Sequence, residues 1–278
     1  MTGREARTVD LAAFTIPRTG RVYDLDSGRW HGMPIPPIHP PFQLLTYRSP
    51  AGLRAEGHDQ FGRADPDATS MVSDLLIAGT HSGTHVDALG HIVCGNAASS
   101  HGSDFGLGSG DADEIPPMVC RGILVDVAGA RGLAALPPRH SISVAEFDEI
   151  TGTTGLTVEA GDVVLFRTGC MGFWPDDYDA YSRHETAGVS EELARHLSSL
   201  GVRAVGSDTN GVEVKPASWP GQPFPVHRHL LVEQGTYLIE SMYLEELGSD
   251  GVAEFLFVAV PARMRGATAA MTRPLAIV

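Results

Sequence analysis

Three histidines and one aspartate fall within eleven consecutive residues, in the segment His81-Ser82-Gly83-Thr84-His85-Val86-Asp87-Ala88-Leu89-Gly90-His91. Imidazole nitrogens and carboxylate oxygens are the ligands that hold zinc, manganese or iron in catalytic sites. The segment contains no cysteine, so it lacks the thiolates of a closed structural zinc site. A set of three protein ligands leaves coordination positions open for water, which metal-assisted chemistry needs. The segment therefore predicts a catalytic metal site.

The backbone of this segment must bend if its histidines are to reach one ion. In a straight strand, which rises about 3.3 Å per residue, His81 and His85 would lie about 13 Å apart. Gly83 lies between them and can adopt the backbone angles that a tight bend requires. A helix would place both histidines on one face, but Asp87 would then point away from that face. We therefore predict a tight turn that carries the ligands.

Apolar runs predict the elements that position this turn. A strand over residues 71–78, with the apolar run Leu75-Leu76-Ile77, ends near Gly79 and leads into the turn. Further strands are predicted at residues 122–127, 162–166, 202–205, 237–240, 254–260 and 274–278. Helices are predicted over residues 144–150, capped by Ser143, and over residues 191–200, with Ser190 as N-cap and Gly201 as the stop. Because strands outnumber helices, we expect a mixed α/β fold with a curved or barrel-like β-sheet and flanking helices.

Residues 31–50 contain six prolines, so this segment cannot form a helix or a central strand. We expect an extended arm that lies over the body or over a partner subunit, because its apolar residues need cover. The chain is accordingly divided into an N-terminal arm, residues 1–50, and a single domain, residues 51–278. The arm predicts a homodimer or a homotetramer. Residues 96–110, rich in glycine and serine, predict a loop beside the metal segment.

The composition of the 278-residue chain is that of an ordinary globular protein, with 42% hydrophobic and 19% charged residues. A formal net charge of −14 argues against a nucleic-acid partner, because no basic patch can meet the phosphates. No apolar run of about 18 residues predicts a membrane span, and the charged opening segment does not resemble a secretory signal. Three cysteines, Cys94, Cys120 and Cys170, cannot form a disulfide framework, which favours a reducing cytoplasm. Cys94 lies close enough to the metal segment to be considered as a nucleophile, although a small buried hydrophobe is the more frequent role.

Residues outside the segment are further candidates for the site. Glu240 ends an apolar strand, where a carboxylate is costly unless it is paired or bound to a metal. His227 follows a proline-rich loop, and Asp208 lies in a loop at a strand end, where aspartates commonly make turns. Aromatic side chains that could form the wall of a substrate pocket, or pack in the core, are Trp30, Phe42, Phe173 and Trp174. Four other histidines, taken singly, are interpreted as surface or core residues: His101, His140, His184 and His196.

The spacing His81-x-Gly83-Thr84-His85-x-Asp87-x-x-x-His91 resembles the H-x-G-T-H-x-D-x-P-x-H signature of the putative cyclase family. That family includes bacterial arylformamidase (kynurenine formamidase) and the manganese-dependent isatin hydrolases. Other segments that are similar to family motifs are residues 161–169, residues 205–209 and the stretch from His227 to Glu240. The resemblance covers roughly residues 20 to 270, and it implies the swivelling β/β/α fold of that family.

Carried over position by position, the resemblance implies metal ligation by His81, His85 and Asp87. It also implies that His91 acts as a catalytic acid and base beside the metal. In the formamidase branch a second metal uses the positions of His91, Asp87, His227 and Glu240, whereas one manganese suffices in the isatin hydrolase branch. The implied cofactor is a divalent metal, Mn²⁺ or Zn²⁺.

Together these features predict a metal-dependent hydrolase that cleaves an amide-type C–N bond in a cyclic amide, an imide or an N-formyl aromatic compound. A bound divalent ion lowers the pKa of water toward neutrality and stabilises the oxyanion, and His91 carries the proton to the leaving nitrogen. The partner is then a small aromatic or cyclic substrate. Alternative hypotheses are a lyase or cyclase acting on a polyketide-like substrate, and a non-haem iron oxygenase in which His85, Asp87 and His227 form a facial triad.

Overall fold

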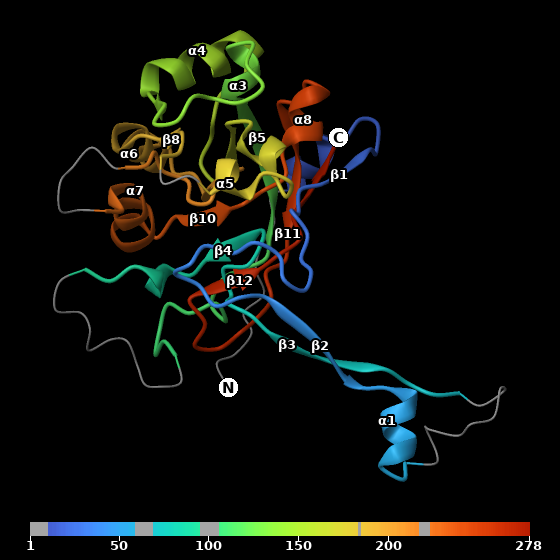
Figure 1. The fold of residues 1–278 in the computed structure, drawn as a ribbon. Helices are drawn as coiled ribbons and strands as arrows, with labels where there is room; N and C mark the ends of the chain where they lie inside the picture. Colours follow the sequence, from blue (N-terminus) through green and yellow to red (C-terminus); the bar gives the residue numbers. More distant parts are fainter. Residues whose placement is uncertain (1–10, 59–68, 95–105, 183–184, 217–222) are drawn as a thin grey trace.

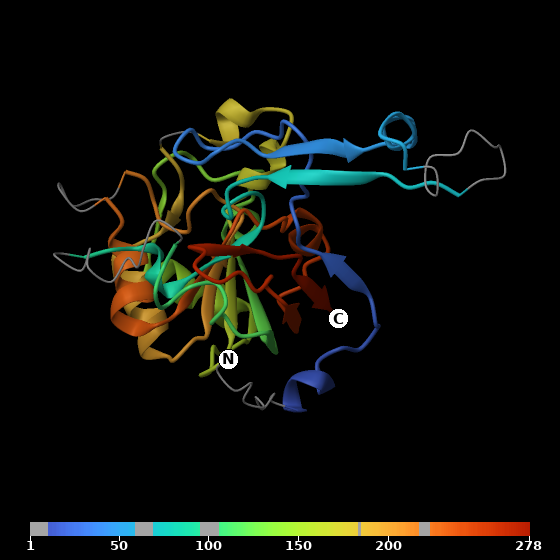
Figure 2. The ribbon, with the colours of Figure 1, turned by 90° about the horizontal axis from the view of Figure 1, so that it is seen from below.

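The computed structural model describes residues 11–58, 69–94, 106–182, 185–216 and 223–278 of the chain. Among these residues, a curled nine-stranded β-sheet forms the centre of the molecule (Figures 1 and 2). In spatial order its strands are β1 (Val22–Asp24), β13 (Leu275–Ile277), β11 (Glu254–Ala259), β5 (Met118–Asp126), β7 (Val163–Arg167), β9 (Ala204–Ser207), β10 (Tyr237–Glu240), β4 (His85–Asp87) and β12 (Ala269–Met271). The four strands from β5 to β10 are parallel, and the pairings on either side of them are antiparallel. The prediction of a mixed α/β fold with a curved sheet is confirmed.

Alternating side chains of the sheet supply two separate hydrophobic cores. In β5, Met118 and Leu124 are buried on one face, whereas Ile123 and Val125 are buried on the other. The second face is covered by helices (Figure 1), namely α3 (Val127–Ala130), α4 (Val144–Thr154), α6 (Glu191–Ser199), α7 (Pro225–His227) and the π-helical segment η5 (Arg228–Gln234). The first face buries Leu247 of α8 (Glu245–Ser249).

The two long helices begin at the caps that the sequence predicts. Ser143 Oγ accepts a hydrogen bond from the Glu146 amide at the start of α4, and Ser190 Oγ accepts one from the Leu193 amide at the start of α6. α4 continues past the predicted residue 150 to Thr154, because the left-handed Gly155, with a φ of 70°, forms its C-cap.

Each predicted strand downstream of the metal segment overlaps an observed one. The largest difference is in β5, which begins at Met118 because Met118 and Cys120 continue the alternation of buried side chains. It ends at Asp126, whose side chain caps α3 by accepting a hydrogen bond from the Gly129 amide. The remaining short elements are η1 (Leu11–Thr15), η2 (Leu89–His91), β6 (Ser141–Ile142), η4 (Cys170–Phe173), α5 (Tyr178–Tyr181) and β8 (Gly188–Val189).

A two-stranded ribbon projects from the body (Figures 1 and 2). It pairs β2 (Gln43–Arg48) with β3 (Ser73–Ile77) in antiparallel register and carries α1 (Pro50–Ala55) at its far end. The predicted strand over residues 71–78 is present as β3, but its apolar run is not buried, since Leu75, Leu76 and Ile77 are 45%, 49% and 49% exposed. The reason is that β3 pairs with β2 alone and takes no part in the main sheet.

The predicted arm contributes to both parts of the molecule. β1 is an edge strand of the main sheet, paired with β13, and β2 belongs to the ribbon. The division into an arm, residues 1–50, and a domain, residues 51–278, stays a prediction. His101, His184 and most of the predicted loop over residues 96–110 lie outside the described residues. Within the described part of the chain, no helix has the length and apolar character needed to cross a membrane.

Candidate metal centre

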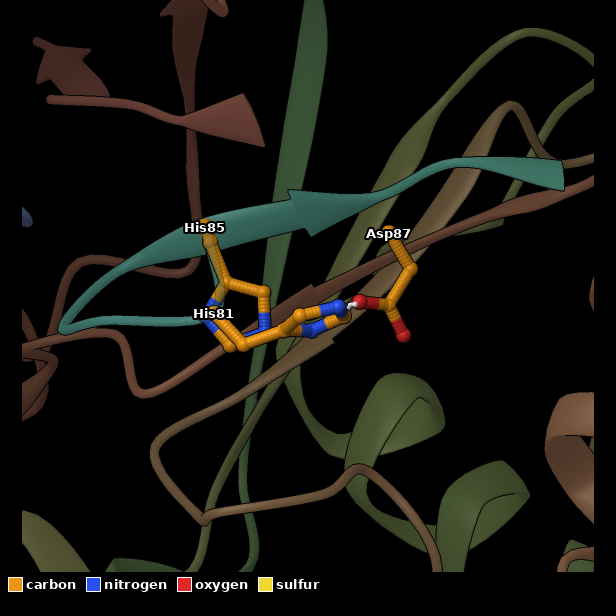
Figure 3. A group of neighbouring side chains, drawn as sticks. All are labelled: His81, His85 and Asp87. Atoms are coloured by element: carbon orange, nitrogen blue, oxygen red, sulfur yellow. Dashed lines mark ion pairs between the residues drawn. The ribbon is translucent and has the colours of Figure 1, made fainter. Parts of the chain in front are cut away.

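β4 places two of the predicted ligands on one face of the main sheet. His85 and Asp87 alternate with Val86, whose side chain is buried in the core on the opposite face. His81 reaches the same place from the turn before β4, and Figure 3 shows the three side chains pointing toward one another. Gly83, with a φ of 60°, makes the bend in that turn. The prediction that the turn itself carries the ligands is therefore wrong for His85 and Asp87, because alternate residues of a strand already share a face.

The first group of potential ligands consists of His81, His85 and Asp87. His81 Nδ1 lies 3.1 Å from Asp87 Oδ1, and His85 Nε2 lies 3.5 Å from the same oxygen. The three side chains are 7%, 3% and 1% exposed. Ligands that each lie about 2.1 Å from one ion are themselves roughly 3–4 Å apart. The group therefore has the spacing that a single ion needs.

A second group shares Asp87 with the first. His227 Nε2 lies 3.7 Å from Asp87 Oδ2 and 2.9 Å from Glu240 Oε1. Glu240 is the register partner of His85 across β10 and β4, and its Oε2 lies 3.6 Å from His85 Nε2. The candidates His227 and Glu240 thus adjoin the first group, one from α7 on the helical face of the sheet and the other from the end of β10.

The chemistry of these atoms fits a divalent cation. His85 Nε2 and both carboxylate oxygens of Asp87 are buried and have no hydrogen-bond partner among the described residues. Leaving such an atom without a partner costs roughly 1–3 kcal/mol, and more for a charged group, which an ion coordinated there would offset. Although burial by itself raises the pKa of Asp87, the adjacent His81 and His85 imidazoles lower it well below its usual range. The carboxylate is therefore charged and available as a ligand.

Three contacts orient the imidazoles of the two groups. His85 Nδ1 lies 2.8 Å from the Gly83 carbonyl oxygen, which can only accept, so Nδ1–H donates and Nε2 is the nitrogen that faces the ligand group. His81 Nε2 lies 3.0 Å from Thr268 Oγ1. His227 Nδ1 is hydrogen-bonded to the carboxylate of Glu213. Metal-binding histidines commonly bond their second ring nitrogen to a carbonyl, a hydroxyl or a carboxylate in this way.

Two residues of this region are not singled out by the sequence. Glu213 is buried, with its carboxylate bonded to His227 and to the Val226 amide. The feature of the sequence that could have identified Glu213 is the alternation Val212-Glu213-Val214, in which a carboxylate separates two apolar side chains. His39 stacks on His81, with ring centroids 4.7 Å apart, and burial together with the neighbouring histidines lowers the pKa of His39 to about 4. Nothing in the surrounding prolines marks His39.

His91 stands at the end of η2 and adjoins both groups. Its ring centroid lies 4.3 Å from that of His81 and 6.5 Å from that of His227. Burial lowers the pKa of His91 to about 4, with His81 and His227 acting in the same direction and the charge of Asp87 opposing them. A neutral imidazole in this position can accept a proton or offer a lone pair, so both roles implied for His91 remain open.

The aromatic candidates lie in two environments. The rings of Trp30 and Trp174 are in contact, with centroids 5.6 Å apart and planes tilted by 54°, and Trp174 Nε1–H donates to the Ser27 carbonyl oxygen at 3.0 Å. Residues 27–29 pack closely on Gly83, so this pair lies beside the turn between the ligands. The other two candidates are Phe42, buried just before β2, and Phe173, the last residue of η4.

Asp208 is surrounded by hydrogen-bond donors. Its carboxylate accepts hydrogen bonds from the Thr168 amide and hydroxyl and from the Gly169 amide, at 2.7 to 3.0 Å. The side chain thus ties the end of β7 to the end of β9. Its assignment to the substrate pocket stays a prediction.

Other candidate residues lie apart from the two groups. His140 pairs with Glu146 of α4 at 2.9 Å, and His196 of α6 contacts the Phe147 ring. Within the described part of the chain, Cys94, Cys120 and Cys170 form no disulfide bond with one another. Among the described residues, Cys94 belongs to neither group of potential ligands.

Comparison with known proteins places this chain in a family. The model of the putative cyclase family matches residues 23–214, which is more than half of the chain, and the protein therefore belongs to this family. No curated protein matches the chain.

Solved structures show the same fold. A protein described as a novel cyclase is 24% identical, with a TM-score of 0.82 over 96% of this chain and 92% of that one. Isatin hydrolase A from Labrenzia aggregata, bound to benzyl benzoate, is 20% identical, with a TM-score of 0.68 over 96% of each chain. A predicted metal-dependent hydrolase from Bacillus stearothermophilus is 21% identical, with a TM-score of 0.57 over 92% of this chain and 97% of that one. At these identities the likeness shows the fold alone, which is the cyclase-like fold that the sequence predicts.

Proposed function

We propose that the protein is a metal-dependent hydrolase that uses water to cleave an amide-type C–N bond. The observation that carries this proposal is the pair of ligand groups that share Asp87, together with three buried ligand atoms that lack hydrogen-bond partners among the described residues. Membership of the cyclase family, and the hydrolases among the proteins of the same fold, support it.

The side chains of the centre take distinct roles in this reaction. His81, His85 and Asp87 hold a divalent ion, Mn²⁺ or Zn²⁺, and His227 and Glu240 are available for a second one. When bound, such an ion supplies a water of lowered pKa and stabilises negative charge on the substrate oxygen. His91 takes a proton from the attacking water and delivers it to the leaving nitrogen.

The proposed substrate is a cyclic amide, an imide or an N-formyl aromatic compound. Trp30 and Trp174 lie beside the turn that carries His81, and Trp30 remains 38% exposed. An aromatic ring of a small molecule can stack on this surface while its carbonyl group faces the ligands. The three widely spaced cysteines, odd in number, cannot form a disulfide framework, which accords with the reducing cytoplasm that we propose as the location.

Metal analysis of protein purified without chelator, followed by a screen of aromatic amides and imides, tests the proposal. We expect at least one equivalent of Mn²⁺ or Zn²⁺, and hydrolysis that chelation removes and the metal restores. Oxygen uptake with Fe²⁺ would instead favour the non-haem iron oxygenase. Ring closure or elimination without addition of water would favour the lyase or cyclase. Folded protein that takes up no divalent ion would contradict all three.

A further inference from the structure

His39 belongs to neither ligand group, yet its ring lies on a ligand. The rings of His39 and His81 are stacked, with centroids 4.7 Å apart and an interplanar angle of 13°. His91 contacts the same His81 ring at 4.3 Å with an angle of 43°. Among the described residues no ring contact joins His39 to His91, so the two imidazoles support His81 separately.

The segment that carries His39 is packed onto the chain just before His81. A Cβ added at Gly79 would lie 3.1 Å from Pro40 Cδ and 3.7 Å from His39 Cβ, so the missing side chain at Gly79 lets this segment approach. Ser82 Oγ donates a hydrogen bond to the Gly79 carbonyl oxygen at 2.7 Å, which joins this contact to the turn. Pro40 also restricts the backbone beside His39. The stack is therefore held by the packing of two segments, and not by the two rings alone.

The geometry of the stack argues against His39 as a ligand. Among the described residues, the two groups whose ligand atoms lie within 4.8 Å of one another do not include His39. A ring binds an ion through a nitrogen at its edge. His39 instead presents its face to His81, while the edges of His81 meet Asp87 and Thr268.

We propose that His39 is a positioning residue, whose ring face fixes the plane of the His81 imidazole so that His81 Nδ1 is directed at Asp87. Partners that orient a ligating histidine raise metal affinity without touching the ion. This inference rests on the proposed metal site, but it does not depend on which reaction the site performs. Because the same segment leads into β2 at Gln43, the stack also connects the base of the ribbon to the metal centre.

Metal affinity, measured by chelator competition, tests the role of His39. His39→Ala should bind Mn²⁺ or Zn²⁺ more weakly than the wild type, by up to the roughly 10–100-fold that loss of a hydrogen-bonded partner of a ligating histidine typically costs. His39→Phe keeps a flat ring without ring nitrogens, so it should restore affinity to within a few-fold of the wild type. The control is His58→Ala, which removes a half-exposed histidine paired with Glu56 and should leave affinity unchanged. Thermal unfolding of each variant in chelator establishes that the metal-free fold is intact.

Two results would overturn the inference. Unchanged affinity in a folded His39→Ala protein would show that the stack positions nothing. Affinity as weak in His39→Phe as in His39→Ala would show that a ring nitrogen of His39, and not its face, supports the metal. The ligand assignment is separated from these outcomes by His81→Ala. If His81→Ala keeps the metal, the site itself is wrong; if it loses the metal while His39→Ala keeps it, only the role of His39 falls.

A second variant tests the packing without altering either ring. Gly79 has no left-handed backbone conformation, so Gly79→Ala is permitted, but its Cβ must push Pro40 away by a few tenths of an ångström. We expect weaker metal binding than in the wild type, with a smaller change than for His39→Ala. Gly152→Ala is the matched control, because a Cβ there meets nothing within 4 Å. Full affinity in Gly79→Ala would contradict the role of the packed segment.

Discussion

Asp87 is the residue on which the whole site depends, because both ligand groups contain it. Its Oδ1 faces His81 and His85, and its Oδ2 faces His227. A carboxylate divided in this way can bind one ion or bridge two. Removing Asp87 should therefore disturb both groups, whereas removing His81 or His227 should disturb only one.

The first prediction follows from this sharing. Asp87→Ala should bind no divalent ion after gel filtration and lose nearly all activity, because each group is left with too few ligands. His227→Ala should lose at most one equivalent. The control His140→Ala, which breaks a pair with Glu146 of α4, should keep its full metal content. An Asp87→Ala protein with the metal content and the catalytic rate of the wild type would show that these residues do not form the metal site.

The second prediction separates the two roles open to His91. If His91 only carries protons, His91→Ala should keep its metal while kcat falls by roughly 10²–10⁴, the usual contribution of a general acid and base. If metal content falls as well, His91 is a ligand of the second group. Metal analysis and steady-state kinetics on the same preparation distinguish these cases, and an unchanged kcat would exclude His91 as the proton carrier.

The third prediction concerns pH. Ligands must lose their protons before they bind, so protons compete with the metal and affinity falls as pH is lowered. Burial alone would lower the pKa of His227, but hydrogen bonds and charges of Glu213 and Glu240 raise it to about 10. Burial would likewise lower the pKa of His85, but the hydrogen bond and charge of Asp87 and the charge of Glu240 raise this pKa above its usual value. Protons should therefore compete with the metal already at pH values above about 6.5, the usual pKa of an imidazole.

Metal titrations at constant ionic strength check the pH dependence. Binding should release protons, which calorimetry in buffers of different ionisation enthalpy would detect. Affinity that is constant between pH 5 and pH 8 would contradict this prediction.

Single residues of the site differ in how far the sequence could predict them. His81, His85 and Asp87 are close in the sequence, so their density alone predicted a metal site. Glu240 was a candidate because a carboxylate at the end of an apolar strand needs a partner, and His227 was a candidate because it follows a proline-rich loop. His39 could not be assigned in this way, because it acts through a contact between segments that pack together only in the folded chain. Glu213 is marked only by the alternation Val212-Glu213-Val214, which does not reveal that His227 is its partner.

At the scale of elements, β4 shows the limit of pattern reasoning. β1, β4 and β12 have three residues each, which is too short for a recognisable alternation, and none of them lies in an apolar run like the one that predicted the equally short β13. β4 is a strand because β10 and β12 pair with it on either side. The longer helices α4 and α6 were predictable because their caps and apolar faces are local features of the sequence.

The fourth prediction tests one of these local features. Ser190→Ala removes the cap of α6, which covers the helical face of the sheet, and should lower the free energy of unfolding by about 1 kcal/mol. Ser199→Ala is the control, because its hydroxyl bonds the His196 carbonyl oxygen, which lies within the same helix. Urea denaturation in chelator measures both. Equal stability of Ser190→Ala and the wild type would show that tertiary packing alone sets the start of α6.

At the scale of the whole molecule, the ribbon is the part whose apolar side chains the described residues leave exposed. Leu44 pairs with Leu76, and Leu45 with Leu75, so apolar side chains lie on both faces of the ribbon. All four are exposed. An isolated two-stranded ribbon is marginally stable in water, and apolar residues in such a ribbon need a partner surface. A second copy of the chain is the partner we predict, because soluble assemblies are mostly symmetric homo-oligomers. Among the described residues, β2 and β3 pair only with each other, so their outer edges are available for two copies to share.

The last prediction concerns that assembly. The wild type should be a homodimer or a homotetramer by light scattering coupled to gel filtration. The double variants Leu44→Glu with Leu76→Glu, and Leu45→Glu with Leu75→Glu, each place charge on one face of the ribbon. Burying a leucine is worth about 1.5–3 kcal/mol. The double variant that places charge on the face covered by the second copy should therefore have a dissociation constant at least tenfold higher than that of the wild type. Leu133→Glu is the control, since Leu133 is equally exposed but lies outside the ribbon. A monomeric wild type, or double variants that both keep the wild-type assembly, would show that the ribbon is not the interface.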